Sequence, residues 1–126
     1  MTPQEIIEQA IRERAEELMT AYEITDPATR ERVREDYLRE AKDECRASGV
    51  KTDLPAPFCR HYEAVEVAKQ FGGQWIGWTY FYGGGKHAEP EAVPWIEDAY
   101  FLDCVEEEKM VTVRTFTKKE TECKSM

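Results

Sequence analysis

The chain has 126 residues, of which 41% are hydrophobic and 34% charged, a composition typical of one folded domain with solvated helix faces. Lys and Arg number 17 against 26 Asp and Glu, and the resulting net charge of −9 argues against direct nucleic-acid binding, because phosphate contacts need a basic footprint. The chain carries no apolar run of membrane-spanning length and no signal-peptide core. We therefore expect a single cytoplasmic domain over residues 1–126 that binds neither nucleic acid nor membrane.

The first part of the chain, residues 1–49, predicts a helical hairpin. Thr2 and Glu5 form a capping-box pattern, and Asp26 followed by Pro27 repeats a helix start. Apolar or small residues then recur at helical spacing in both segments, at Ile7, Ile11, Ala15, Leu18 and Tyr22 and at Val33, Tyr37, Leu38, Ala41, Cys45 and Ser48. Because a short turn joins the two segments, we expect them to pack antiparallel.

Residues 50–73 predict a connector followed by a third helix. Prolines mark the connector between Asp53 and Pro57. From Phe58 to Phe71 the apolar residues have helical spacing, and Gly72-Gly73 ends the segment. The stretch Glu63–Val67 also fits a short strand, but the length of the whole segment favours the helix.

The densest run of strand-favouring residues is Gln74–Tyr82, which has glycines at both ends. Alternation along this strand places Trp75, Gly77, Thr79 and Phe81 on one face and Ile76, Trp78, Tyr80 and Tyr82 on the other. Both faces are apolar or aromatic, so neither should lie fully open to water. We expect helices to cover one face, and a loop, a partner or a ligand to cover the other.

The remainder of the chain predicts a loop, two further strands and a polar tail. The loop at residues 83–97 is rich in glycine and proline, and the strands Tyr100–Val105 and Met110–Phe116 flank a polar turn, which predicts a hairpin. The tail covers residues 118–126. Because helices precede strands, we predict an α+β fold in which the helical hairpin and the third helix pack on a three-stranded antiparallel sheet over residues 74–117.

The aromatic strand and the acidic stretch after it suggest a protein-binding surface. Between Lys86 and Lys109 the chain holds eight acids and no Lys or Arg. Aromatic anchors surrounded by charge are typical of interface hot spots, and the acids suit a basic partner. The predicted binding residues are Trp78, Tyr80, Tyr82, Lys86, His87, Glu89, Glu91, Trp95, Glu97 and Asp98. The same aromatics suit a homodimer, and the plainest alternative is a solvated acidic turn.

The glycine-rich loop Gly83–His87 offers a second functional hypothesis, a small-ligand, phosphate-binding or enzymatic domain. Consecutive glycines present backbone N–H groups to an anion, and Lys86 adds a positive charge. The loop is not a Walker A motif, because His87 follows the lysine, and the acids at Glu89 and Glu91 would repel an anion. The other interpretation is a loop tip whose glycines supply backbone freedom.

Cysteine and histidine positions give little support for catalysis or metal binding. The four cysteines have irregular spacing and no C-x-x-C pair, which indicates reduced thiols. Cys59 with His61 or His87 has the residue types of a thiol–imidazole pair or a zinc site, but neither the spacing nor the flanking residues match a known motif. We expect no catalytic residue, no cofactor and no metal.

The stretch Trp78–Glu91, which reads WTYFYGGGKHAEPE, is followed by Trp95 and then Asp98-Ala99-Tyr100, and this pattern resembles small uncharacterised proteins of phage and prophage genomes. The resemblance covers about the last half of the chain and transfers no functional residue. It implies a context, because compact acidic phage proteins of this size often bind a host protein, including defence nucleases. The resulting prediction is a non-enzymatic interaction module, with inhibition of a host defence or nucleic-acid-handling protein as its implied role.

Overall fold

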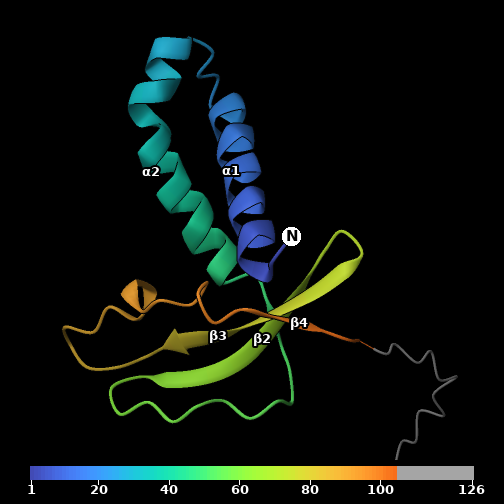
Figure 1. The fold of residues 1–126 in the computed structure, drawn as a ribbon. Helices are drawn as coiled ribbons and strands as arrows, with labels where there is room; N and C mark the ends of the chain where they lie inside the picture. The colour runs from blue at the N-terminus through green and yellow to red at the C-terminus, as the bar shows by residue number, and fades with distance from the viewer. Residues whose placement is uncertain (105–126) are drawn as a thin grey trace, which may run out of the picture.

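The structure is a computed structural model that describes residues 1–104, and within them an α-helical hairpin packs on a four-stranded antiparallel sheet. The elements are α1 (Pro3–Ala21), α2 (Pro27–Arg46), β1 (Val50–Lys51), β2 (Glu63–Phe71), β3 (Gln74–Tyr82), the 3-10 helix η1 (Pro90–Ala92) and β4 (Tyr100–Leu102). Figure 1 shows α1 and α2 rising from one side of the sheet, and the predicted α+β class is confirmed. The predicted strand at Met110–Phe116 and the tail at residues 118–126 lie outside the described residues.

Both helices begin at the predicted caps. The Thr2 hydroxyl accepts a hydrogen bond from the Glu5 N–H at 3.1 Å, while the Glu5 carboxylate accepts one from the Thr2 N–H at 2.8 Å. Asp26 caps α2 by accepting from the Thr29 N–H at 3.0 Å. These bonds satisfy backbone donors that the first helical turn leaves unpaired, and the predicted helical hairpin is confirmed.

The predicted third helix is wrong, because its second half, Glu63–Phe71, is strand β2. β2 pairs antiparallel with β3 along its full length, with Glu63 opposite Tyr82 and Phe71 opposite Gln74. Gly72 occupies the tight turn between them with a φ of 62°. Pairing with β3 satisfies one edge of the β2 backbone and overrides the helical spacing of the apolar residues, so the short-strand interpretation was the better one.

The predicted three-stranded sheet is also wrong, because within residues 1–104 the sheet has four strands in the order β1-β2-β3-β4. β3 lies inside this sheet, as predicted. Its outer neighbour β4 places Tyr100 opposite Gly77, and the short strand β1 places Val50 opposite Ala68 of β2. The connector after α2 therefore contributes an edge strand that the sequence did not suggest.

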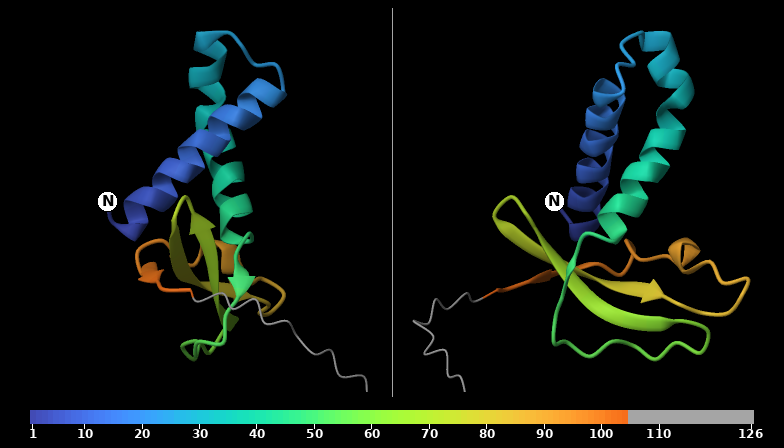
Figure 2. Two further views of the ribbon diagram at one scale, coloured as in Figure 1. Left: turned by 90° about the vertical axis from the view of Figure 1, so that its right-hand side faces the viewer. Right: turned by 180° about the vertical axis from the view of Figure 1, so that it is seen from behind.

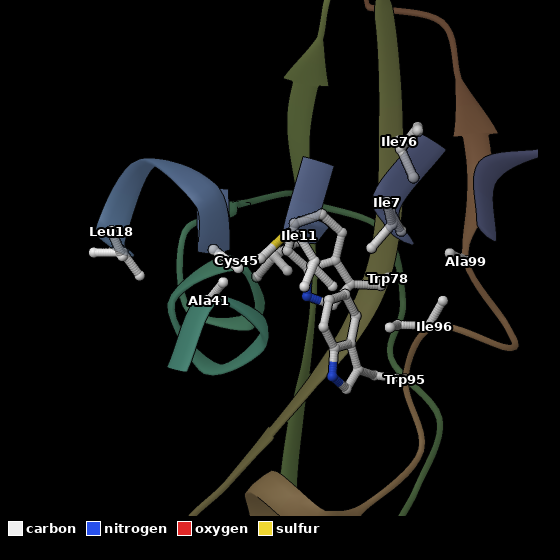
Figure 3. Packing of buried hydrophobic residues seen from close by; sticks show 12 residues of the cluster. Ile7, Ile11, Leu18, Ala41, Cys45, Ile76, Trp78, Trp95, Ile96 and Ala99 are labelled. Atoms are coloured by element: carbon white, nitrogen blue, oxygen red, sulfur yellow. The ribbon is translucent and has the colours of Figure 1, made fainter. Parts of the chain in front are cut away.

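The main core lies between the helical hairpin and the sheet. Figure 3 shows Ile7 and Ile11 of α1 close to Trp78 of β3, and Figure 2 shows from two further sides that α1 and α2 stay on one side of the sheet. The Trp78 side chain is 0% exposed, and its indole N–H donates to the Arg46 carbonyl at 3.2 Å. Trp95, from the loop after β3, packs on Trp78 with ring centroids 5.3 Å apart. The loop therefore returns over the same sheet face as the helices.

Candidate functional site

The predicted aromatic site divides between the core and the surface. Trp78 and Trp95 are only 0% and 3% exposed, so neither side chain presents a surface to a partner. Tyr80 is half-buried beneath the Arg46 guanidinium, whose central carbon lies 4.5 Å from the ring centroid. Tyr82 is 39% exposed and stacks on Tyr80 with ring centroids 5.8 Å apart. The face that sequence analysis assigned to a partner is largely the face that α1, α2 and the returning loop cover.

The polar members of the predicted site are all exposed on the loop after β3: Lys86, His87, Glu89, Glu91, Glu97 and Asp98. Within residues 1–104 no ion pair involves any of them. Gln4 of α1 ties down one end of this loop by donating to the carbonyls of Glu97 and Ala99 at 3.0 Å each. The acids therefore form a solvated fringe rather than a paired cluster.

The glycine loop has a conformational explanation. Gly83 and Gly84 have φ angles of 72° and 100°, which favour glycine. A Cβ on Gly84 would lie 2.5 Å from the Ala88 Cβ, and the Ala88 N–H closes a turn by donating to the Gly85 carbonyl at 2.9 Å. Turn geometry and close packing account for these glycines, and anion binding at this loop stays a prediction.

The other face of the sheet points away from α1 and α2, and we call it the outer face. It is formed by alternate residues of adjacent strands: Ala64, Glu66, Ala68, Gln70, Trp75, Gly77, Thr79, Phe81, Tyr100 and Leu102. Trp75, Phe81 and Leu102 are each only partly buried. Figure 1 shows that neither helix approaches this side of the sheet. The outer face thus keeps large apolar side chains within reach of solvent.

One end of the outer face is hollowed into a groove of about 330 Å³. Its apolar lining is Val50, Leu54, Ala68, Trp75 and Leu102. Charged residues at its margin are Lys51, Asp53 and Asp103. Val50 and Leu54 are exposed, so apolar surface continues from the groove onto the edge of the sheet. A concave apolar surface with a polar margin is typical of a docking site.

A buried carboxylate lies at the centre of the outer face. Glu66 is 5% exposed, and its two carboxylate oxygens each accept one hydrogen bond, from the Thr79 hydroxyl and from the Tyr100 hydroxyl, both at 2.5 Å. Burial, followed by this hydrogen bond and the charge of Glu66, raises the pKa of Tyr100 above its usual value. Within residues 1–104 no Lys, Arg or His side chain pairs with Glu66.

Gly77 makes this arrangement possible. Tyr100 comes from β4 and Glu66 from β2, so the tyrosine ring must cross β3 to reach the carboxylate. A Cβ on Gly77 would lie 2.7 Å from the Tyr100 ring and 2.9 Å from Leu102 Cδ1, so only glycine leaves the necessary space. Sequence analysis missed this site, although a glycine inside an aromatic strand is a recognised sign of close approach by another group.

Comparison with known protein families, with curated proteins and with solved structures finds no match to this chain. Across residues 1–104 no three His, Cys, Asp or Glu side chains gather closely enough to hold a metal ion. The same part of the chain contains no helix with both the length and the apolar character needed to cross a bilayer.

Proposed function

We propose that this protein is a non-enzymatic interaction module that binds a protein partner through the outer face of the sheet. The observation that supports this proposal is the partly exposed apolar surface at Trp75, Phe81 and Leu102, on the side away from the helices. Aromatic and aliphatic side chains in the middle of a patch carry most of the binding energy in protein interfaces. The proposal replaces Trp78, which is buried, with Trp75 of the same strand as the aromatic anchor.

The charge of the chain favours a basic partner. A net charge of −9 attracts positively charged proteins over long range and speeds their association. The exposed acids on the loop after β3 add to this field. The resemblance to phage proteins extends the proposal to a host defence or nucleic-acid-handling protein, which the module would inhibit by occupying its basic surface.

The test is partner capture followed by measurement of affinity. The full chain is immobilised, proteins retained from a bacterial lysate are identified by mass spectrometry, and one purified candidate is titrated by calorimetry. We expect Trp75→Ala combined with Phe81→Ala to weaken binding at least about tenfold, because interface aromatics commonly contribute more than 1 kcal/mol each. Tyr82→Ala, on the opposite face of β3, is the matched control.

Unchanged affinity in the double variant, with weakened binding in the Tyr82 control, would contradict the proposal. Sedimentation of the chain alone tests the remaining alternative, a homodimer. A dimer at micromolar concentration that the Trp75 and Phe81 substitutions dissociate would assign the outer face to a second copy of the chain rather than to another protein.

A further inference from the structure

We propose that Glu66 is the receptor for a cationic side chain, Arg or Lys, that the protein partner inserts into the outer face. The inference rests on the proposed function and adds the chemistry by which the partner is recognised. It starts from one observation: Glu66 is nine-tenths buried, and within residues 1–104 no positive charge is paired with it.

Burial of an unpaired carboxylate is costly, and the two hydroxyl donors offset only part of that cost. Buried charges in proteins are ordinarily paired with an opposite charge or a metal ion. The hydrogen bonds from Thr79 and Tyr100 hold the carboxylate in place but bring no positive charge. An ionised carboxylate has about four acceptor sites, and each oxygen of Glu66 accepts only one bond from the described residues. Glu66 therefore keeps unused acceptor capacity, and no positive charge from residues 1–104 is paired with it.

The surrounding side chains suit an Arg or Lys stem. The Tyr100 ring lies across Gly77, between Trp75 and Thr79 along β3, so aromatic surface adjoins the carboxylate. A guanidinium group binds a carboxylate through its planar fork and stacks on aromatic rings at the same time. The apolar part of the stem would lie against the same rings. The combination of a carboxylate and adjacent rings favours Arg over Lys.

The charge of the whole chain supports the same occupant. With a net charge of −9 the chain repels acidic segments and attracts basic ones. Glu66 would convert this general attraction into recognition at one position, because a charge-assisted bond in a buried site is stronger than one at the surface.

The site can be tested with a small probe in place of the unidentified partner. The full chain, labelled with ¹⁵N, is titrated with N-acetyl-arginine methylamide, and N-acetyl-norleucine methylamide is the uncharged control. We expect saturable shifts at the amides of Glu66, Thr79 and Tyr100 with the arginine probe and none with the norleucine probe. Glu66→Gln should weaken the response at least about tenfold, because the bond to a charged acceptor is lost.

Glu63→Gln is the matched control, because Glu63 lies on the same strand, is exposed and faces the opposite side of the sheet. It should leave probe binding unchanged, and the spectrum and melting temperature of each variant establish that it folds. Absence of shifts at Thr79 and Tyr100, or an equal response in Glu66→Gln, would overturn the inference.

The cation-receptor proposal and the outer-face interface can fail independently of each other. If Trp75→Ala weakens partner binding while Glu66→Gln changes neither partner nor probe binding, the cation receptor is wrong and the outer-face interface stands. If neither substitution affects partner binding, both proposals fail.

Discussion

Replacement of Gly77 by Ala tests the architecture of the outer face. A new Cβ would lie 2.7 Å from the Tyr100 ring and 2.9 Å from Leu102 Cδ1, closer than real Cβ contacts allow, so the ring must move. Overpacking of this kind costs about 1–3 kcal/mol. Loss of the Tyr100 bond to a charged, buried acceptor costs about 1.5–3 kcal/mol. The lower chain entropy of unfolded Ala returns about 0.4–1 kcal/mol. We therefore expect a net loss of about 1.5–5.5 kcal/mol in the free energy of unfolding.

The assay is urea denaturation followed by tryptophan fluorescence. Gly73→Ala is the control, because a Cβ there meets nothing within 4 Å, and we expect a change within about 0.5 kcal/mol. In a double-variant cycle, Tyr100→Ala should remove most of the Gly77→Ala penalty, since the ring that clashes is gone. A loss below about 0.5 kcal/mol in Gly77→Ala itself would refute the account of how Tyr100 reaches Glu66.

Three further predictions follow from the same contacts. The raised pKa of Tyr100 means that folding favours its neutral form. The stability that this shift adds to the folded state is fully present below the unfolded pKa of about 10 and is lost as pH rises through the higher folded pKa. Absorbance at 295 nm should show one late-titrating tyrosine that disappears in Tyr100→Phe, and a curve with all tyrosines alike would contradict this. Trp78→Phe should lower the free energy of unfolding by about 2–4 kcal/mol, because it loses volume and a buried hydrogen bond. Trp95→Phe should cost less, because its buried indole N–H has no partner among the described residues. Equal losses of the two variants in chemical denaturation would contradict the role given to the Trp78 hydrogen bond. Gly84→Ala should lower the melting temperature, since φ is positive and a Cβ would lie 2.5 Å from the Ala88 Cβ. Gly85→Ala should leave the melting temperature unchanged, because a Cβ there meets nothing within 4 Å. Equal melting temperatures of the two variants would show that turn geometry does not explain the glycines of this loop.

The helices were predictable because their signals are local. The caps at Thr2 and Asp26 and the apolar spacing that follows depend on residues within a few turns of one another. Strand β2 was not predictable in the same way. Its apolar residues fit both periods over a short window, and the choice depended on pairing with β3, which is a non-local interaction. The Gly72-Gly73 pair between two nine-residue runs was the local clue to a hairpin.

At the candidate site, the sequence predicted which residues share a face of β3 but not which face stays open. Alternation along β3 correctly separated the residues of its two faces, because that period is fixed by strand geometry. Which face the helices cover is decided elsewhere, by the loop that brings Trp95 back onto Trp78 and by the packing of α1 and α2. Strand alternation alone held no information on that choice. The network at Glu66 joins three strands, so it also required the fold before it could be seen.

The most direct test of the central claim is to map the surface that the partner protects. Hydrogen exchange or cross-saturation NMR of the complex would report which backbone amides become shielded on binding. We predict protection at Trp75, Thr79 and Tyr100 on the outer face, with the loop at residues 83–97 unchanged. Protection confined to Tyr82 and that loop would contradict the outer-face interface and would favour the surface first predicted from the sequence.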